Sequence, residues 1–79
     1  MLKIKDEVST KKLKEFGLEK IENYNSEDFK EITLEGEDFN GWVEIKGFKI
    51  WEENFYSSCI ELDILFDLIQ AGLVEKVEG

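Results

Sequence analysis

Residues 58–77, SCIELDILFDLIQAGLVEKV, form the most apolar run of the chain and decide its fold. Ser58 is followed three residues later by Glu61, which is the spacing of a capping box at a helix N-terminus. Neither proline nor glycine interrupts residues 59–71. We therefore predict a helix over Cys59–Ala71, and at about 13 residues it is too short to span a bilayer.

The apolar side chains of this predicted helix cover most of its circumference. When the helix is projected at 100° per residue, Asp63, Asp67 and Gln70 fall on one narrow polar stripe. The remaining circumference is apolar and carries Leu62, Ile64, Leu65, Phe66, Leu68 and Ile69. A helix with so wide an apolar arc is expected to pack on more than one side.

The residues after this helix predict how it ends. Gly72 supplies a left-handed residue after the last turn, and Leu73 can then fold back on Leu68 as in a Schellman motif. Val74 and Val77 indicate a short terminal strand or an extended tail on the core.

Charge distinguishes the middle of the chain from its ends. The 79 residues include 19 acids and 10 lysines, with no arginine, histidine or proline. Residues 27–63 alone hold 11 acids and three lysines, a net charge of −8. Such a field repels nucleic acid and anionic lipid and attracts basic protein surfaces. Because arginine is the usual residue for bidentate contacts with phosphate and guanine, direct nucleic-acid binding is not expected, and neither is membrane binding.

Length and cysteine content set further limits. The chain is predicted to be a single small globular domain spanning residues 1–79. Its start has charges but no apolar segment of the kind found in signal peptides. The single Cys59 excludes an intramolecular disulfide and a multi-cysteine metal site, and we expect it to be a small buried hydrophobe.

The first half of the chain predicts a short helix. Met1–Lys5 alternates apolar and basic residues, as an edge strand or a frayed start would. Ser9 is a suitable N-cap, and Val8 and Leu13 occupy the positions of a hydrophobic staple. With Gly17 as the residue after the helix, the helix covers residues 10–16 and must dock on the core to be stable.

Residues 18–41 predict strands and turns. Leu18–Tyr24 can be a strand, and residues 25–28 form a polar turn. In Phe29–Glu35, Ile32 and Leu34 alternate with polar residues, which is the period of a half-buried strand. Residues 35–41, EGEDFNG, are rich in turn residues.

Residues 41–52, GWVEIKGFKIWE, predict a β-hairpin with Lys46-Gly47 as its two-residue turn. The facing pairs would be Ile45 with Phe48, Glu44 with Lys49, Val43 with Ile50, and Trp42 with Trp51. Each pair is chemically matched, and cross-strand pairs of these kinds stabilise a sheet. Lysine is not a preferred first residue of such a turn, so a single strand bent at Gly47 is the alternative.

Few residues of the chain favour catalysis. Without histidine, and with one cysteine, the usual nucleophile–base pairs and a zinc site of nitrogen and sulfur ligands cannot be built. Residues 35–41 resemble a calcium loop, but Gly36 and Gly47 fall where the first and last ligands would have to be. Carboxylate pairs leave an acid–base enzyme as a third hypothesis. We predict a protein that is not an enzyme and has no catalytic residues, metal or cofactor.

The outer face of the predicted hairpin is the candidate partner-binding surface. Exposed aromatic side chains beside charges are typical of protein-binding hot spots. The residues predicted to form it are Glu37, Asp38, Trp42, Glu44, Trp51, Glu52 and Glu53. The alternative is that the short N-terminal helix, or Phe39, Phe55 and Tyr56, covers the tryptophans as a second small core.

The C-terminal residues 62–77, LDILFDLIQAGLVEKV, carry a family resemblance. They resemble the ending, LDxLxDLIQAGLVEKV, of a group of small hypothetical proteins from phages and prophages of low-GC Gram-positive bacteria. The resemblance covers about the last fifth of the chain and implies kinship, without an activity to transfer. Small acidic phage proteins include inhibitors of host defence, anti-CRISPR proteins among them.

These observations predict an α+β fold: a short N-terminal helix, an antiparallel sheet of three or four strands between about Leu18 and Glu52, and a C-terminal helix packed on one sheet face. The predicted function is that of a non-enzymatic, phage-encoded acidic protein in the host cytoplasm. It would bind a basic protein surface, such as the nucleic-acid-binding surface of a defence nuclease. The alternatives are a phage structural or assembly protein that forms homo-oligomers through its sheet, and a small phage protein with no anti-defence role.

Overall fold

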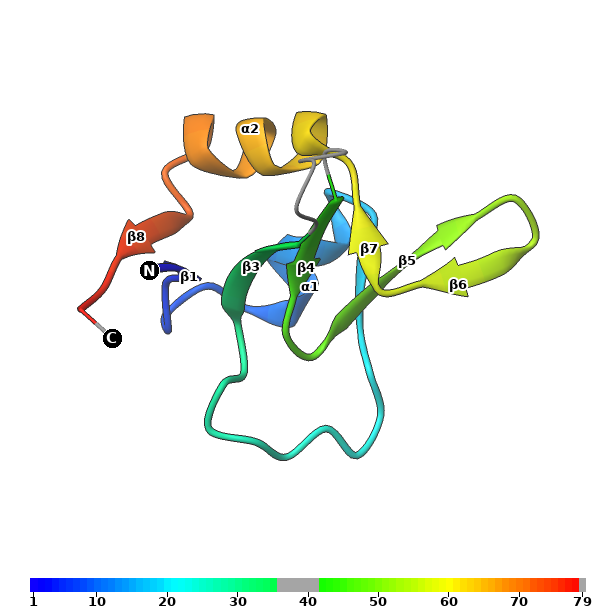
Figure 1. Cartoon of the computed structure of the whole chain (residues 1–79), viewed down its shortest axis with the longest axis horizontal. Helices are drawn as coiled ribbons and strands as arrows, with labels where there is room; N and C mark the ends of the chain where they lie inside the picture. Colours follow the sequence, from blue (N-terminus) through cyan, green and yellow to red (C-terminus); the bar gives the residue numbers. More distant parts are fainter. Residues whose placement is uncertain (36–41, 79) are drawn as a thin grey trace.

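The computed structural model describes residues 1–35 and 42–78, with Glu35 and Trp42 described by their backbone alone. Within these residues the chain forms eight strands and two helices in an α+β fold (Figure 1). In chain order the elements are β1 (Leu2–Ile4), α1 (Thr10–Lys14), β2 (Leu18–Lys20), β3 (Glu31–Glu35), β4 (Trp42–Ile45), β5 (Phe48–Glu52), β6 (Phe55–Ser57), β7 (Cys59–Ile60), α2 (Leu62–Gln70) and β8 (Val74–Lys76).

The strands form two antiparallel sheets. The larger sheet has the order β7-β4-β3-β1-β8, and the smaller has the order β2-β5-β6. The α+β class predicted from the sequence is confirmed, but the prediction of one sheet of three or four strands between Leu18 and Glu52 is wrong. Three short strands outside that interval complete the larger sheet. Among them, β1 is an interior strand that pairs with both β3 and β8, and the expectation of an edge strand or a frayed start is wrong.

The predicted hairpin of residues 41–52 does not form. β4 pairs with β3 and β7, whereas β5 pairs with β2 and β6, so the two strands belong to different sheets. Trp42 is opposite Glu35, and Trp51 is opposite Tyr56, so the two tryptophans do not face each other. The bent-strand alternative is closer to the structure, because the chain leaves one sheet at Ile45 and enters the other at Phe48.

Backbone hydrogen bonds around Gly47 explain this change of sheet. Lys46 is still paired with the start of β3: its N–H donates to Glu31 O at 2.8 Å, and the N–H of Lys30 donates to its carbonyl at 2.8 Å. The next residue, Gly47, has φ +90° and accepts a hydrogen bond from Ile21 N–H at 2.8 Å. Tertiary partners on both sides of the turn therefore outweigh the local cross-strand matches within residues 42–51.

The N-terminal helix forms where the sequence predicts it, although α1 ends two residues before the expected end. Ser9 is its N-cap, and the Ser9 hydroxyl accepts a hydrogen bond from Lys12 N–H at 3.1 Å. Val8 and Leu13 are both buried, which fits the hydrophobic staple, and Gly17 has a positive φ of +84°. Leu13 thereby docks this short helix on the core.

The C-terminal helix begins later than its sequence predicts. Glu61 is the N-cap of α2 and makes no side-chain capping bond, so the Ser58–Glu61 capping box is wrong. Cys59 and Ile60 instead form β7, in which Ile60 pairs with Val43 and is buried. Pairing with the edge of β4 buries a β-branched side chain and takes these two residues from the helix. Cys59 is half-buried.

The end of α2 has the predicted Schellman geometry. Gly72 has φ +76°, and its N–H donates to Ile69 O at 3.0 Å. The N–H of Leu73 donates to Leu68 O at 3.1 Å, which is the second bond of the motif. The chain then reverses into β8, so the predicted terminal strand is confirmed.

The core lies between the two sheets and the helices. It is built from Ile4, Val8, Leu13, Leu18, Ile32, Val43, Ile45, Phe48, Ile50, Ile60, Leu65 and Leu68. The alternation predicted for β3 holds only in part, since Ile32 is buried but Leu34 is exposed. α2 packs on the core through Leu65 and Leu68, with Ile64 half-buried beside them. Because Leu62, Phe66 and Ile69 are exposed, the prediction that it packs on more than one side is wrong.

Figure 1 shows how the elements are placed around this core. α2 lies across one end of the larger sheet, and β8 and both chain ends lie together at one side of the molecule. The backbone of Met1 joins them, because its carbonyl accepts a hydrogen bond from Val77 N–H at 2.8 Å. β5 and β6 extend away from the body on the opposite side.

Candidate functional site

The hairpin of residues 48–57, which we call the aromatic hairpin, starts in the core at Phe48 and Ile50, and its end, from Trp51 to Tyr56, projects from the body of the molecule (Figure 1). Glu52 is opposite Phe55, so Glu53 and Asn54 form a two-residue turn. Both turn residues have positive φ, +42° for Glu53 and +77° for Asn54, as in a type I′ turn. This turn matches the twist of the strands that it joins, so the hairpin is a preformed element.

The two faces of the aromatic hairpin both expose aromatic rings. Trp51 and Tyr56 are opposite each other and pack edge to face, with ring centroids 4.8 Å apart. Lys49 Nζ lies 4.1 Å from the centroid of the Tyr56 ring. These contacts orient Trp51, although 60% of it is exposed. Phe55 lies on the other face of the hairpin, because successive side chains of a strand alternate between faces, and it is 56% exposed.

Glu19 completes the Trp51 face of this sheet. It is opposite Lys49 on the neighbouring strand β2. Hydrogen bonding to the Glu19 carboxylate raises the pKa of the Tyr56 phenol, and loss of hydration adds to the effect. The raised pKa reinforces the neutral form that a phenol already has at physiological pH.

The structure brings together three of the seven residues predicted to bind a partner. Trp51, Glu52 and Glu53 lie at the end of the aromatic hairpin and are exposed. Glu44 lies on β4 in the other sheet, where its carboxylate pairs with Lys46 Nζ at 2.9 Å, so it is not part of this site. Trp42 is also on β4, and its side chain lies outside the described residues, as do Glu37 and Asp38.

Phe55 and Tyr56 belong to this site but were not among the predicted partner-binding residues; the sequence named them only in the alternative, as cover for the tryptophans. Tyr56 does contact Trp51, but both rings stay exposed. The signal that identifies them is the string WEENFY at 51–56, in which Glu53-Asn54 separates two aromatic strand ends. Asparagine in a two-residue connection is a hairpin signal, although it usually comes first in the turn.

A second feature with shifted pKa values lies in the loop between β2 and β3. The Tyr24 hydroxyl donates a hydrogen bond to the Asp28 carboxylate. This bond raises the pKa of Tyr24 and lowers the pKa of Asp28. The Tyr24 ring also packs near Phe29, at 6.1 Å between centroids. These contacts fix the loop against the body. A structural role therefore explains the Tyr24–Asp28 pair, and no catalytic role is needed.

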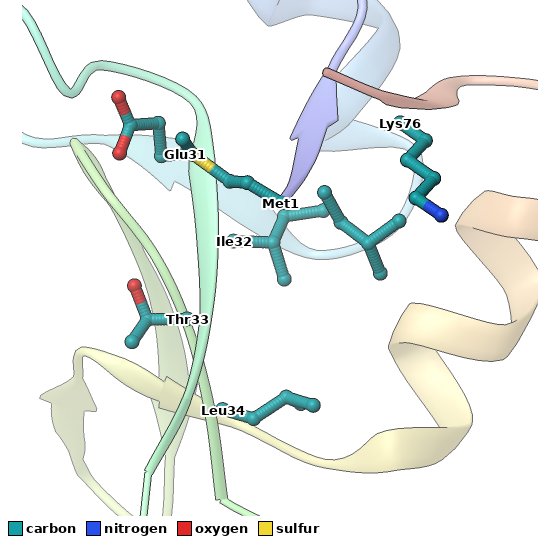
Figure 2. A pocket seen from close by; sticks show the side chains of 7 residues that line it. Met1, Glu31, Ile32, Thr33, Leu34 and Lys76 are labelled. Atoms are coloured by element: carbon teal, nitrogen blue, oxygen red, sulfur yellow. The ribbon is translucent and has the colours of Figure 1, made fainter. Parts of the chain in front are cut away.

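A shallow groove of about 420 Å³ opens beside α2 (Figure 2). Ile32, Leu34 and Lys76 point to the side on which α2 lies, whereas Glu31 and Thr33 point away. The walls of the groove are thus mainly apolar. Among the residues that line it, no pair of titratable groups converges as acid–base chemistry would need.

Neither a metal site nor a helix that could span a membrane is found in the described residues. In residues 1–35 and 42–78, no group of three carboxylate or thiol side chains is placed to hold a metal ion. None of the helices described there is long and apolar enough to cross a membrane.

Comparison with known proteins finds no matching family model, no matching curated protein and no matching solved structure.

The Glu53→Asn substitution is expected to stabilise the protein by about 1 kcal/mol, because asparagine adopts the left-handed conformation more readily than glutamate. The measurement is urea unfolding of the variant and the parent. Glu52→Asn is the matched control, since it removes the same charge one residue earlier, within β5. An equal gain from both variants would mean that relief of acidic repulsion, rather than turn geometry, is the cause.

Proposed function

We propose that this chain is a non-enzymatic binding protein whose aromatic hairpin engages a basic surface on another protein. The observation that carries the proposal is the exposure of Trp51, Phe55 and Tyr56 on one projecting element, next to two acids at its tip. Tryptophan and tyrosine are among the residues most enriched at hot spots of protein interfaces. A monomer with no partner for this hairpin would keep three large aromatic rings in water.

Charge supports a basic partner. Glu52 and Glu53 flank the aromatic rings, and the surrounding segment 27–63 has a net charge of −8. Acids around an apolar centre accelerate encounter with a positive surface and disfavour wrong partners. The type I′ turn supports the same proposal, because a hairpin that is ordered before binding loses less conformational entropy on binding.

We infer the class of partner from charge and from the resemblance of residues 62–77. Proteins that bind nucleic acid present extended basic surfaces, which neutralise the phosphates of their ligand. The family resemblance suggests a phage origin, in which a nuclease of host defence is the natural target. We therefore propose that the chain acts in the host cytoplasm and occupies the nucleic-acid channel of such a nuclease.

The experiment measures binding to a panel of purified defence nucleases from low-GC Gram-positive bacteria, at about 50 mM and about 500 mM salt, a range over which exposed charges become strongly screened. At least one nuclease is expected to bind and to be displaced by its own nucleic acid. Trp51→Ala should weaken this binding about tenfold or more. Glu52→Lys with Glu53→Lys should slow association and reduce the dependence on salt.

Matched controls separate the hairpin from general effects. Leu34→Ala removes a large apolar side chain that is 52% exposed, but on β3. Glu7→Lys with Glu78→Lys changes the net charge equally at two other exposed acids. If these controls weaken binding as much as the hairpin variants, the hairpin is not the binding site. If all nucleases in the panel fail to bind while the protein self-associates in sedimentation, the assembly alternative replaces the proposal.

A further inference from the structure

α2 exposes an apolar stripe that the fold does not use. Leu65 and Leu68 are buried against the core, while Leu62, Phe66 and Ile69 are 38%, 60% and 46% exposed. These three side chains, which we call the α2 stripe, are spaced i, i+4 and i+7 and so lie along one line of the helix surface. That spacing is the one by which two helices pack along a common seam.

Acids border the α2 stripe on its solvent side. Asp63 and Asp67 are exposed. Each comes one residue after a stripe residue, Leu62 or Phe66, so the two acids form a row beside the stripe. Glu61 at the N-cap is also exposed, and residues 61–71 contain no lysine. An apolar seam with acids along one edge is complementary to a helix that has apolar residues on one face and basic residues beside them.

Charge argues against the other occupants of such a seam. A second copy of the chain would place the same acids against each other, in a protein of net charge −9. Anionic lipid and nucleic acid are repelled by the same acids. What remains is a protein segment that supplies lysine or arginine.

We propose that the α2 stripe binds a basic amphipathic helix of another protein. The stripe is on a different element from the aromatic hairpin, and Figure 1 shows α2 across the end of the larger sheet, away from the hairpin tip. The inference therefore goes beyond the proposed function and does not depend on it. Because α2 offers only the nine residues Leu62–Gln70, the contact is short, and its affinity is expected to be micromolar.

The test uses a synthetic amphipathic peptide, about 18 residues long to be helical, with leucine on one face and lysine along both flanks. It is titrated into the ¹⁵N-labelled protein and followed by NMR. We expect shifts concentrated on Leu62–Gln70. Phe66→Ser with Ile69→Ser should weaken binding at least tenfold, and Asp63→Lys with Asp67→Lys at least fivefold. Glu7→Lys with Glu78→Lys, which changes the net charge equally at two exposed acids outside α2, should leave it unchanged.

Several results would overturn the inference. A peptide with glutamate in place of lysine should not bind, and equal binding by it would mean that charge plays no part. This comparison uses the parent protein alone and so does not depend on whether the variants fold. Shifts on the aromatic hairpin in place of α2 would also refute the proposal. Self-association that Phe66→Ser abolishes, or binding to phosphatidylglycerol vesicles that it abolishes, would assign the stripe to a second copy or to lipid.

Discussion

Gly47→Ala is expected to lower the free energy of unfolding by more than about 3 kcal/mol, a large fraction of the stability of so small a domain. Two costs combine. Gly47 has φ +90°, a conformation that alanine adopts only with strain. A Cβ at this position would also lie 2.5 Å and 2.8 Å from Cδ1 and Cε1 of Phe29. Such distances are well inside van der Waals contact, so one of the two groups must move.

The surroundings of Phe29 limit that movement. Its ring packs between Tyr24 and Phe48, with centroids 6.1 Å and 5.3 Å away. The added Cβ would also meet the Tyr24 ring at 3.1 Å, so both rings would have to shift together. The backbone of Gly47 is fixed in turn, because its carbonyl accepts the hydrogen bond from Ile21 N–H. The turn that passes the chain from one sheet to the other therefore has no room for a side chain.

Urea unfolding of Gly47→Ala and of a matched variant, Gly72→Ala, separates the steric cost of the added Cβ from the cost of the backbone conformation. Gly72 has φ +76°, but a Cβ there would meet nothing within 4 Å. Gly72→Ala should cost about 1 kcal/mol, the backbone part alone. Phe29→Ala combined with Gly47→Ala should destabilise less than the sum of the two single changes, because the first removes the obstacle to the second. If Gly47→Ala and Gly72→Ala have equal effects, crowding by Phe29 is not the cause.

Local signals predicted the parts of the fold whose causes are local. The N-cap at Ser9 and the Schellman end at Gly72 each depend on a few consecutive residues, and both form. The strand around Ile32 was predicted from a short alternation, which holds in part, and the terminal strand was predicted from the apolar residues Val74 and Val77. The backbone groups of the two helix ends are satisfied by partners a few residues away, so no long-range pairing was needed to predict these ends.

The wrong predictions concern segments for which a distant partner wins. Val43 matches Ile50 well as a hairpin pair, yet its strand partners are Leu34 and Ile60. Ser58 and Glu61 have the spacing of a capping box, yet Ile60 gains more by burial in β7. Sequence patterns contain no term for such long-range pairing, which depends on the register of several strands at once.

The same difference between local and long-range pairing explains why only part of the candidate site was predicted. Trp51, Glu52 and Glu53 are consecutive, so any fold that exposes one end of the strand brings them together. Trp42 and Glu44 were included only through the hairpin register, and they fall on the other sheet when that register fails. Tyr56 belongs beside Trp51 because β5 forms its hairpin with β6, a pairing that a hairpin over residues 41–52 does not suggest.

Lys30→Met is expected to destabilise the protein by about 2–4 kcal/mol, an effect that no sequence pattern indicated. Lys30 is 7% exposed, and its ammonium group has no carboxylate partner among its hydrogen bonds within the described residues. Its Nζ donates instead to three backbone carbonyls, those of Val8 at 2.7 Å, Asp6 at 3.1 Å and Lys5 at 3.4 Å. These bonds tie the turn between β1 and α1 to the start of β3.

Loss of the Lys30 ammonium group affects the carbonyls that it binds to different degrees. Lys5 O keeps a hydrogen bond from Val8 N–H at 3.1 Å, so it stays satisfied. The bond to the Val8 carbonyl is buried and the shortest of the three, and this oxygen would have no described donor after the substitution. Methionine fills much of the same volume and removes the cost of burying a charge, so the net loss is smaller than three charge-assisted bonds would suggest.

Lys20→Met is the matched control in urea unfolding. Lys20 is exposed, and its Nζ lies 5.6 Å from the Phe29 ring centroid, close to the 5.7 Å of Lys30. The two variants therefore lose the same charge and a similar contact with the ring, and they differ in the carbonyl bonds. Because these bonds join a charge to dipoles within the protein, the difference should persist at high salt, where surface ion pairs weaken. A difference that disappears with salt would show that Lys30 acts through the acidic surface and not through the carbonyls.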